Sequence, residues 1–366
     1  MLKLMTPGPV QVPREVLEAQ LAAPPYHRSA EFRELMASLR EDLLAMSRGA
    51  HEVALLAGSG TTAVDAMVWS LLRPGDRVLA IVNGEFSERM AASAAARGAV
   101  VDVIRAEPGG APDPAEVVGA VRRGGHKAVL LVRSETSTGV LYPVKGLAEE
   151  LSAMGVELLV DDVSGFAGNE IEVGWGVTAL ATCSHKALAA PPGVGIVLLS
   201  EDAVRSLRAR PPGVPSSIDL SLYVEFSGRL ETPFTPPLTV LSALRAALGR
   251  IKRVGLGNFI EAHRSRSRLL YDLLTKLGFE PLPASAALRS NTVAALRSPV
   301  GSGPVVEAAR RRGYLISPGM GPLRDEVVRV GTMGDVTEDD VRSLAAAIRE
   351  ALEAPGVGFE PTHPFG

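Results

Sequence analysis

The stretch VALLAGSGTTA at residues 53–63 decides the fold class, because it joins an apolar run to a glycine turn and then to a helical pattern. The apolar residues 53–57 predict a strand, and the apolar spacing over 62–72 predicts a helix. Glycines at such a turn let backbone N–H groups at the helix start point at an anion. A phosphate group is the natural ligand, although a purely structural turn accounts for the glycines equally well.

Strands and helices alternate along the chain on both sides of this turn. The apolar spacing predicts further helices at 13–22, 29–48, 87–96, 114–122 and 144–154. It predicts further strands at 78–82, 100–104, 128–133 and 156–161, then at 178–183 and 195–199 with no helix between the last two. Such alternation is typical of an α/β fold with a mostly parallel sheet and helices on both faces.

The pattern changes near residue 232, where TPFTPP forms a proline-rich connector. Beyond it the sequence predicts helices at 238–253, 257–277 and 337–354, and short strands at 292–296, 314–316 and 327–330. We therefore predict an N-terminal segment (1–20), a large domain with the central sheet (21–236) and a smaller C-terminal α+β domain (237–355). The Gly- and Pro-rich residues 356–366 are expected to form a flexible tail.

Composition excludes several classes of function. The net charge is −3 and basic residues are not concentrated, so no nucleic-acid partner is expected; the runs at 122–123 and 310–312 are interpreted as solvated helix ends. No apolar run reaches the length of a membrane span, and the N-terminus lacks the pattern of a signal peptide. Cys183 is the single cysteine, so no intrachain disulfide can form. A cytoplasmic protein without a metal site is the expectation.

Asp161 follows the apolar strand 156–160, at the edge where parallel sheets bind their ligands. A carboxylate in this position favours a protonated ring nitrogen, because its charge stabilises the cationic form. An aspartate that caps the next segment is the commoner alternative.

Lys186 ends the motif SHK at 184–186 and precedes the apolar, proline-rich run ALAAPPG at 187–193. Burial of a lysine lowers its pKa and gives the neutral amine that forms Schiff bases with carbonyl compounds. Most lysines are surface charges, but these apolar neighbours do not suggest a solvated side chain.

Arg329 lies in the apolar run VVRVG at 327–331. Its fixed fork of donors suits a bidentate clamp on a substrate carboxylate. Taken alone, however, Arg329 is better interpreted as a member of a structural ion pair. Together, a phosphate cradle, a partner for a pyridinium nitrogen, a Schiff-base lysine and a carboxylate clamp are the parts that a pyridoxal-phosphate (PLP) enzyme needs.

A nicotinamide dehydrogenase is the rival that the glycine turn suggests, since residues 58–63 also match a dinucleotide fingerprint. That fingerprint needs an acidic residue at the end of the second strand, where this chain has Asn83. No lysine follows the second glycine, so the turn is not an ATP-binding loop either.

Over nearly its whole length the chain resembles the class V aminotransferases, in particular the alanine–glyoxylate and serine–pyruvate branch. The matching motifs follow one another in the family's order from TPGP at residues 6–9. They are HRSxEF at 27–32, GSGT at 58–61, LxPGD at 72–76, NGxF at 83–86, ETSTGV at 135–140, DxV at 161–163, SHKxLxxPPG at 184–193 and RxG at 329–331.

The resemblance implies the PLP-dependent transferase fold (fold type I) and a role for each matching residue. Lys186 would hold the cofactor as a Schiff base and move the substrate's proton, and Asp161 would hold the ring nitrogen. Gly8 would lie beside the substrate, and Arg329 would clamp its carboxylate. The other residues implied in cofactor binding are Ser59, Gly60, Thr61 and His185 at the phosphate, Phe86 and Val163 at the ring faces, Thr136 at the ring hydroxyl, and Thr235 at the phosphate of a neighbouring subunit.

The implied reaction is a ping-pong transfer of an amino group from alanine or serine to glyoxylate or pyruvate, in a homodimer with active sites at the subunit interface. Aspartate, glutamate or phosphoserine are alternative substrates, for which Arg28 could supply a second anion site. Arg28 is more simply explained as capping a helix or pairing with an acid. Thr232 replaces a tyrosine that contacts the partner's phosphate in some relatives.

Two other functions remain as alternatives. A cysteine desulfurase-like lyase needs a nucleophilic cysteine on a mobile loop, whereas Cys183 lies in a predicted buried strand and is interpreted as a small core residue. A non-catalytic binding module on the same scaffold would have no use for Lys186, Asp161 and Arg329 together.

Overall fold

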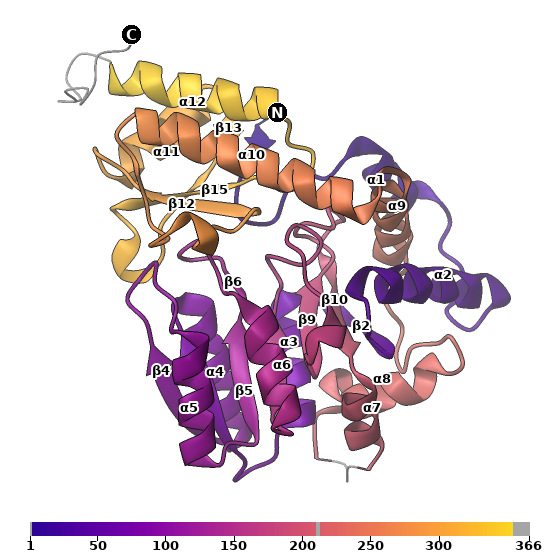
Figure 1. Ribbon diagram of the computed structural model, residues 1–366. Helices are drawn as coiled ribbons and strands as arrows, with labels where there is room; N and C mark the ends of the chain where they lie inside the picture. Colours follow the sequence, from indigo (N-terminus) through magenta and orange to yellow (C-terminus); the bar gives the residue numbers. More distant parts are fainter. Residues whose placement is uncertain (1, 210–212, 354–366) are drawn as a thin grey trace.

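The computed structural model describes residues 2–209 and 213–353, so the predicted tail at 356–366 lies outside the described residues. Within them, a seven-stranded sheet and a four-stranded sheet lie one above the other, each with its own helices (Figure 1).

The larger sheet has the strand order β2-β10-β9-β8-β5-β3-β4. Only β10 runs antiparallel to its neighbours, β2 and β9, which confirms the predicted mostly parallel sheet. The strands are β2 (Glu52–Gly58), β3 (Arg77–Val82), β4 (Val100–Arg105), β5 (Ala128–Val132), β8 (Glu157–Asp161), β9 (Ala179–Cys183) and β10 (Gly193–Leu199).

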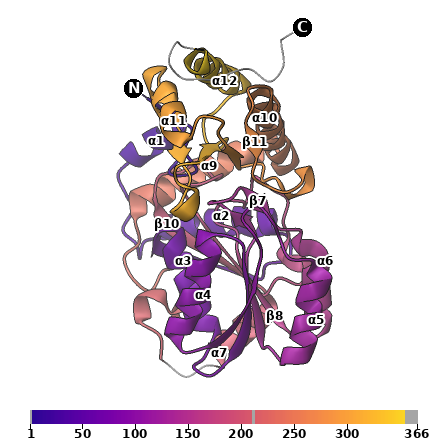
Figure 2. The ribbon, with the colours of Figure 1, turned by 90° about the vertical axis from the view of Figure 1, so that its left-hand side faces the viewer.

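Helices cover both faces of this sheet, as Figure 2 shows for α3 and α4 on one side and α5 and α6 on the other. Alternate residues of β3 point to opposite faces: Leu79 and Ile81 pack in one core cluster, and Val78 and Ala80 in the other. The first cluster includes residues of α1 (Arg14–Glu18), α2 (Ala30–Ser47), α5 (Pro114–Gly124), α6 (Val144–Ala153) and α9 (Leu238–Val254). The second includes residues of α3 (Gly60–Leu71), α4 (Glu85–Arg97), α7 (Glu201–Arg208) and α8 (Leu220–Ser227).

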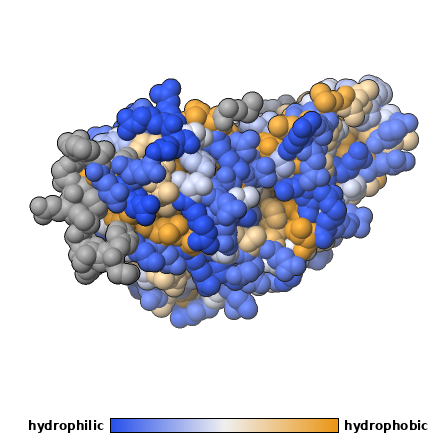
Figure 3. Space-filling view, turned by 90° about the horizontal axis from the view of Figure 1, so that it is seen from above, coloured by the Kyte–Doolittle hydropathy of each residue, from blue (hydrophilic) through white to orange (hydrophobic). Residues whose placement is uncertain are grey.

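The smaller sheet is antiparallel and has the order β11-β12-β15-β14. Its core cluster also holds Met5, because β1 (Lys3–Leu4) pairs with β13 (Tyr314–Leu315) and brings the N-terminal segment to this part of the chain. The remaining elements here are α10 (Leu256–Lys276), β11 (Glu280–Pro281), β12 (Val293–Arg297), α11 (Ser302–Arg311), β14 (Ser317–Pro318), β15 (Val327–Gly331) and α12 (Glu338–Leu352). From above, hydrophilic side chains cover most of the visible face, with hydrophobic ones in smaller patches (Figure 3).

Every helix and strand predicted from the sequence has a counterpart in the described residues, mostly within two residues at each end. The two-residue strands β1, β6 (Ser134–Glu135), β7 (Val140–Leu141), β11 and β14 and the helices α7, α8 and α11 were not predicted. Although α9 was assigned to the smaller domain, it packs in a core cluster of the large sheet; the domain boundaries themselves stay predictions. None of the described helices has both the length and the apolar character needed to cross a membrane.

Candidate active site

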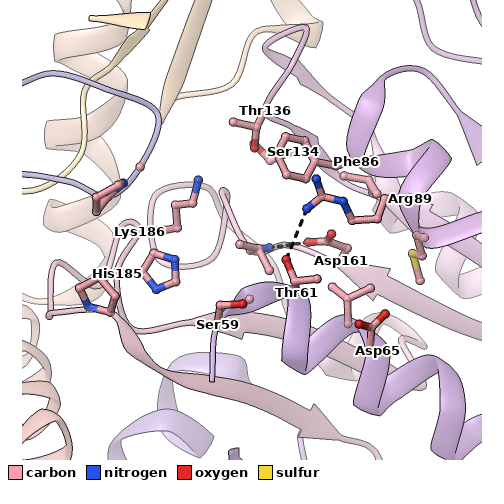
Figure 4. Close-up of a pocket in the computed structure, with 18 residues that line it drawn as sticks. Ser59, Thr61, Asp65, Phe86, Arg89, Ser134, Thr136, Asp161, His185 and Lys186 are labelled. Atoms are coloured by element: carbon pink, nitrogen blue, oxygen red, sulfur yellow. Dashed lines mark hydrogen bonds between the residues drawn. The ribbon is translucent and has the colours of Figure 1, made fainter. Parts of the chain in front are cut away.

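A cavity of about 320 Å³ lies at the carboxyl ends of the parallel strands. Its walls come from the β2–α3 turn, the first turns of α4, the ends of β5 and β8, the segment after β9 and the N-terminal segment (Figure 4). This is the edge at which open α/β sheets bind ligands. The predicted site residues that line it are Gly8, Ser59, Gly60, Thr61, Phe86, Thr136, Asp161, Val163, His185 and Lys186.

The β2–α3 turn packs too closely for a side chain at its centre. A Cβ atom on Gly60 would lie 2.6 Å from a methyl group of Val163, so glycine is required there. The backbone N–H of Ser59 donates to Thr62 Oγ1 over 3.1 Å, which fixes the start of α3. The first N–H groups of a helix have no partner within the helix, so this turn can donate several hydrogen bonds to an anion.

Asp161 is buried, with only 6% of its surface exposed, and lines the cavity. Its Oδ1 accepts a hydrogen bond from the backbone N–H of Val163 at 2.9 Å, and no described residue forms an ion pair with it. Burial is the main cause that raises the pKa of Asp161 to about 7. The adjacent Asp162, by contrast, is paired with Arg133 at 3.0 Å. Asp161 is therefore a buried acid that a cation in the cavity would stabilise.

Lys186 reaches the N-terminal segment across the cavity. Its Nζ donates to the carbonyl oxygen of Pro7 over 2.7 Å, and a Cβ on Gly8 would lie 2.6 Å from Nζ. Burial lowers the pKa of Lys186, and the positive charge of Arg329 lowers it further. Both effects favour the neutral amine, which is the nucleophilic form.

His185 and Cys183 lie close to Lys186, and both are uncharged at neutral pH. Burial, together with the Lys186 charge, lowers the pKa of His185 to about 4, and its buried Nδ1 bonds to no described residue. Burial raises the pKa of Cys183 to about 12, so its thiol is a poor nucleophile. This agrees with the interpretation of Cys183 as a core residue.

Arg329 lies behind Thr136 and is not among the residues that line the cavity. Its Nη1 donates to the carbonyl of Thr136 over 3.3 Å and its Nε to that of Pro318 over 2.9 Å. It is 9% exposed, and burial lowers its pKa to about 10. No acidic residue in the described part of the chain forms an ion pair with it, so the structural ion pair that the local sequence favoured is absent there.

Glu135 holds together the two loops that carry Phe86 and Thr136. Its buried carboxylate accepts hydrogen bonds from the backbone N–H of Phe86 and Ser87, at the start of α4, and from Ser137 Oγ. The negative charge also suits this helix N-terminus. Glu135 was not among the site residues predicted from the sequence, although it lies within the ETSTGV motif.

Arg28, Thr232 and Thr235 lie away from the cavity lining. Arg28 pairs with Glu231 at 3.0 Å and donates to the carbonyl of Thr232 over 2.7 Å, so it takes the alternative of pairing with an acid. The Thr232 hydroxyl donates to the carbonyl of Phe234. Thr235 is exposed on the same segment.

Arg89 and Asp65 line the cavity but were not predicted. Arg89 lies one helical turn after Phe86 on α4, and its guanidinium lies 5.0 Å from the centre of the Phe86 ring. That spacing is the signal that could have found it. The described residues contain no group of three or more His, Cys, Asp or Glu side chains that could hold a metal ion.

Comparison with known proteins gives consistent matches over most of the chain. The family model described as "Aminotransferase class-V" matches residues 7–309. The chain is 31% identical to the alanine–glyoxylate aminotransferase of Oryctolagus cuniculus, covering 96% of this chain and 92% of that protein. It is 34% identical to a 2-aminoethylphosphonate–pyruvate transaminase of Burkholderia pseudomallei, covering 97% and 98%. The solved structure of a subgroup IV aspartate aminotransferase from Thermus thermophilus is similar with a TM-score of 0.89, at 33% identity and covering 96% and 99%.

Proposed function

The chain belongs to the class V aminotransferases, and on this basis we propose that it moves an amino group from alanine or serine to glyoxylate or pyruvate. Membership confirms the resemblance, the PLP-dependent transferase fold and the aminotransferase activity predicted from the sequence. The observation that carries the proposal is one cavity lined by both a lysine of lowered pKa and a buried acid without a cationic partner.

The residues of the cavity fit pyridoxal phosphate. The buried carboxylate of Asp161 would bind the protonated ring nitrogen, and the unpartnered Nδ1 of His185 is a group that a phosphate could satisfy. The start of α3 would donate to the phosphate through the backbone of Ser59, Gly60 and Thr61. Phe86 and Val163 would pack on the two ring faces, and Thr136 would lie at the ring hydroxyl.

The side chains divide the work of proton transfer and binding. When bound, the cofactor supplies an electron sink for the pair left behind as the substrate's Cα loses its proton. The neutral amine of Lys186 would accept that proton and deliver it to C4′ of the cofactor. Asp161 keeps the ring nitrogen protonated because its negative charge favours the cation. Pro7 and Gly8 hold the lysine close to the reacting atoms.

Arg329 is the residue that we assign to the substrate carboxylate, on the family resemblance and because it contacts Thr136, which lines the cavity, although Arg329 itself does not line it. Its Nε and Nη1 are bound to backbone carbonyls, whereas Nη2 has no hydrogen bond to a described residue. The engagement of Arg28 by Glu231 leaves that arginine unsuited to a second acidic group of the substrate. This supports small monocarboxylic amino acids over aspartate, glutamate or phosphoserine.

A homodimer is part of the proposal. Tyr26 and Phe234 are exposed by 66% and 44%, on two segments that the bonds from Arg28 to Glu231 and Thr232 hold together. Exposed aromatic side chains are typical of protein interfaces. Thr235 lies beside Phe234 and is exposed, as a residue that reaches into a neighbouring subunit's site would be.

Single-turnover reactions of the PLP-loaded protein test the substrate assignment. We expect L-alanine or L-serine to change the cofactor's absorbance fastest and to release pyruvate or hydroxypyruvate, identified by mass spectrometry. L-aspartate, L-glutamate and phosphoserine are the comparison arms and should react at least tenfold more slowly, because one missing buried charge contact costs roughly that much. Faster reaction with any acidic donor would contradict the substrate assignment and leave the aminotransferase activity in place.

Substitution of Arg329 by lysine should raise the KM for the amino donor roughly tenfold or more, because a point charge replaces the bidentate fork. The kcat should change less, since the clamp is made in both the ground and transition states. Steady-state kinetics measures both constants, and PLP affinity serves as the control that should not change. An unaltered KM would show that the substrate carboxylate binds elsewhere.

A further inference from the structure

The predicted phosphate site lacks a positive charge. Ser59, Gly60 and Thr61 are neutral, and His185 is neutral as well because burial lowers its pKa to about 4. A phosphate monoester carries about −1.5 to −2 charges at neutral pH. The start of α3 contributes only about half a positive charge. Most of the phosphate's charge would thus be uncompensated by these residues.

Among the described residues that line the cavity, Lys186 and Arg89 are the only lysine and arginine side chains. Lys186 has its own role, which leaves Arg89. Its Nη1 lies 3.4 Å from Thr61 Oγ1, at the start of α3, and the two side chains point toward each other in Figure 4. No described acidic residue forms an ion pair with Arg89; Asp65, which also lines the cavity, accepts a hydrogen bond from Ser93.

From these contacts we propose that Arg89 binds the phosphate group of the cofactor and supplies its counter-charge. The proposal rests on the proposed function, in which pyridoxal phosphate occupies the cavity. A guanidinium fork matches the geometry of phosphate oxygens. The ring of Phe86 holds the guanidinium within reach by a cation–π contact, and Thr61 orients it from the side of the helix start.

Binding of two aldehydes to the cofactor-free protein tests this role. Pyridoxal phosphate and pyridoxal differ only in the phosphate, so a residue that binds the phosphate affects one and not the other. In Arg89→Gln we expect the Kd for pyridoxal phosphate to rise roughly tenfold or more, as for a lost hydrogen bond to a charged group. The Kd for pyridoxal should stay within about twofold of wild type. Arg89→Lys keeps the charge but loses the guanidinium fork, so its Kd for pyridoxal phosphate should lie between those of the wild type and Arg89→Gln.

Arg97→Gln is the matched control. Arg97 lies on the same helix, its guanidinium is 5.6 Å from the centre of the Trp69 ring, and it donates to the carbonyls of Trp69 and Leu72, away from the cavity. Its loss should leave both Kd values unchanged. The ³¹P resonance of the bound cofactor gives a readout independent of activity. Without Arg89 the phosphate's pKa should rise, because a nearby cation favours the dianion.

Two results would overturn the assignment. Equal loss of affinity for both aldehydes would mean that Arg89 acts on the ring, through Phe86. Unchanged affinity for pyridoxal phosphate, with a raised KM for an acidic donor, would make Arg89 a substrate residue. Both results leave the aminotransferase activity standing, whereas a wild-type protein that binds no pyridoxal phosphate would remove the proposed function as well.

Discussion

Replacement of Lys186 by alanine is expected to lower the transamination rate by roughly four orders of magnitude or more. The side chain has two tasks, since its amine joins the cofactor covalently and carries the substrate's proton. No other described amine can take over, because the only other cation that lines the cavity is the guanidinium of Arg89. The variant should also lose the absorbance of the covalently bound cofactor.

Borohydride reduction followed by peptide mass spectrometry measures the covalent link directly. In the wild type the cofactor should be found on Lys186, and in the variant on no peptide. Lys145→Ala is the control, because Lys145 contacts the Trp175 ring at 5.8 Å, away from the cavity, and should leave the rate unchanged. Added methylamine should restore part of the rate of Lys186→Ala, since it can carry the proton. Near-normal turnover in the variant would remove the basis of the proposed function.

The strands of the large sheet were predictable because each is a short apolar run between turn residues. The direction of β10 was not predicted from the sequence, although a signal was present: no helix lies between the predicted strands 178–183 and 195–199, and a parallel pair would need such a crossover. The helix α7 did carry a signal, since Ser200 caps it and Ala203, Val204 and Leu207 form its buried face. The strands β6 and β7 have two residues each, which is too short for any periodicity.

For the site, likewise, residues that local sequence identifies were predicted, and residues whose role depends on tertiary contacts were not. Asp161 and Lys186 were predictable because Asp161 is the last residue of β8, Lys186 lies three residues after β9, and the ends of parallel strands meet at one edge. Arg329 was misjudged locally, because sequence does not show that Thr136 and Pro318, rather than an acid, receive its donors. Arg89 was missed because its contact with Thr61 spans 28 positions, and an arginine on a helix is normally a solvated residue.

Asp161→Ala is expected to lower kcat by about a thousandfold or more, because the electron sink depends on a protonated ring nitrogen and Asp161 is the only buried carboxylate among the described residues that line the cavity. The KM for the amino donor should change far less, since Arg329 is untouched. Rapid-mixing absorbance measurements should place the loss in the step that removes the Cα proton, and a deuterated Cα should make that step slower still. Retention of more than a tenth of the rate would show that the ring nitrogen needs no anionic partner here.

Asp161→Asn separates the charge of this residue from its shape through the pH dependence of stability. The pKa of Asp161 in the folded, cofactor-free protein is raised to about 7, above its ordinary value of 3.8. Its contribution to stability is therefore full below about pH 4 and is lost as pH rises through 7. Cofactor-free Asp161→Asn should match the wild type most closely at or below about pH 4 and unfold at a higher temperature than the wild type near pH 8.

The cofactor should reverse that order. A protonated ring nitrogen compensates ionised Asp161, so the increase in Tm on adding pyridoxal phosphate should grow from about pH 5 to pH 8 in the wild type and grow less in Asp161→Asn. Lysine deprotonation also favours cofactor binding at higher pH, and the charge of Asp161 raises the pKa of Lys186. The same comparison in a Lys186→Ala background therefore isolates the carboxylate. If the increase in Tm on adding pyridoxal phosphate is the same in both proteins at every pH, the charge of Asp161 does not stabilise the bound cofactor. The buried carboxylate would then destabilise the cofactor-free fold without contributing to cofactor binding.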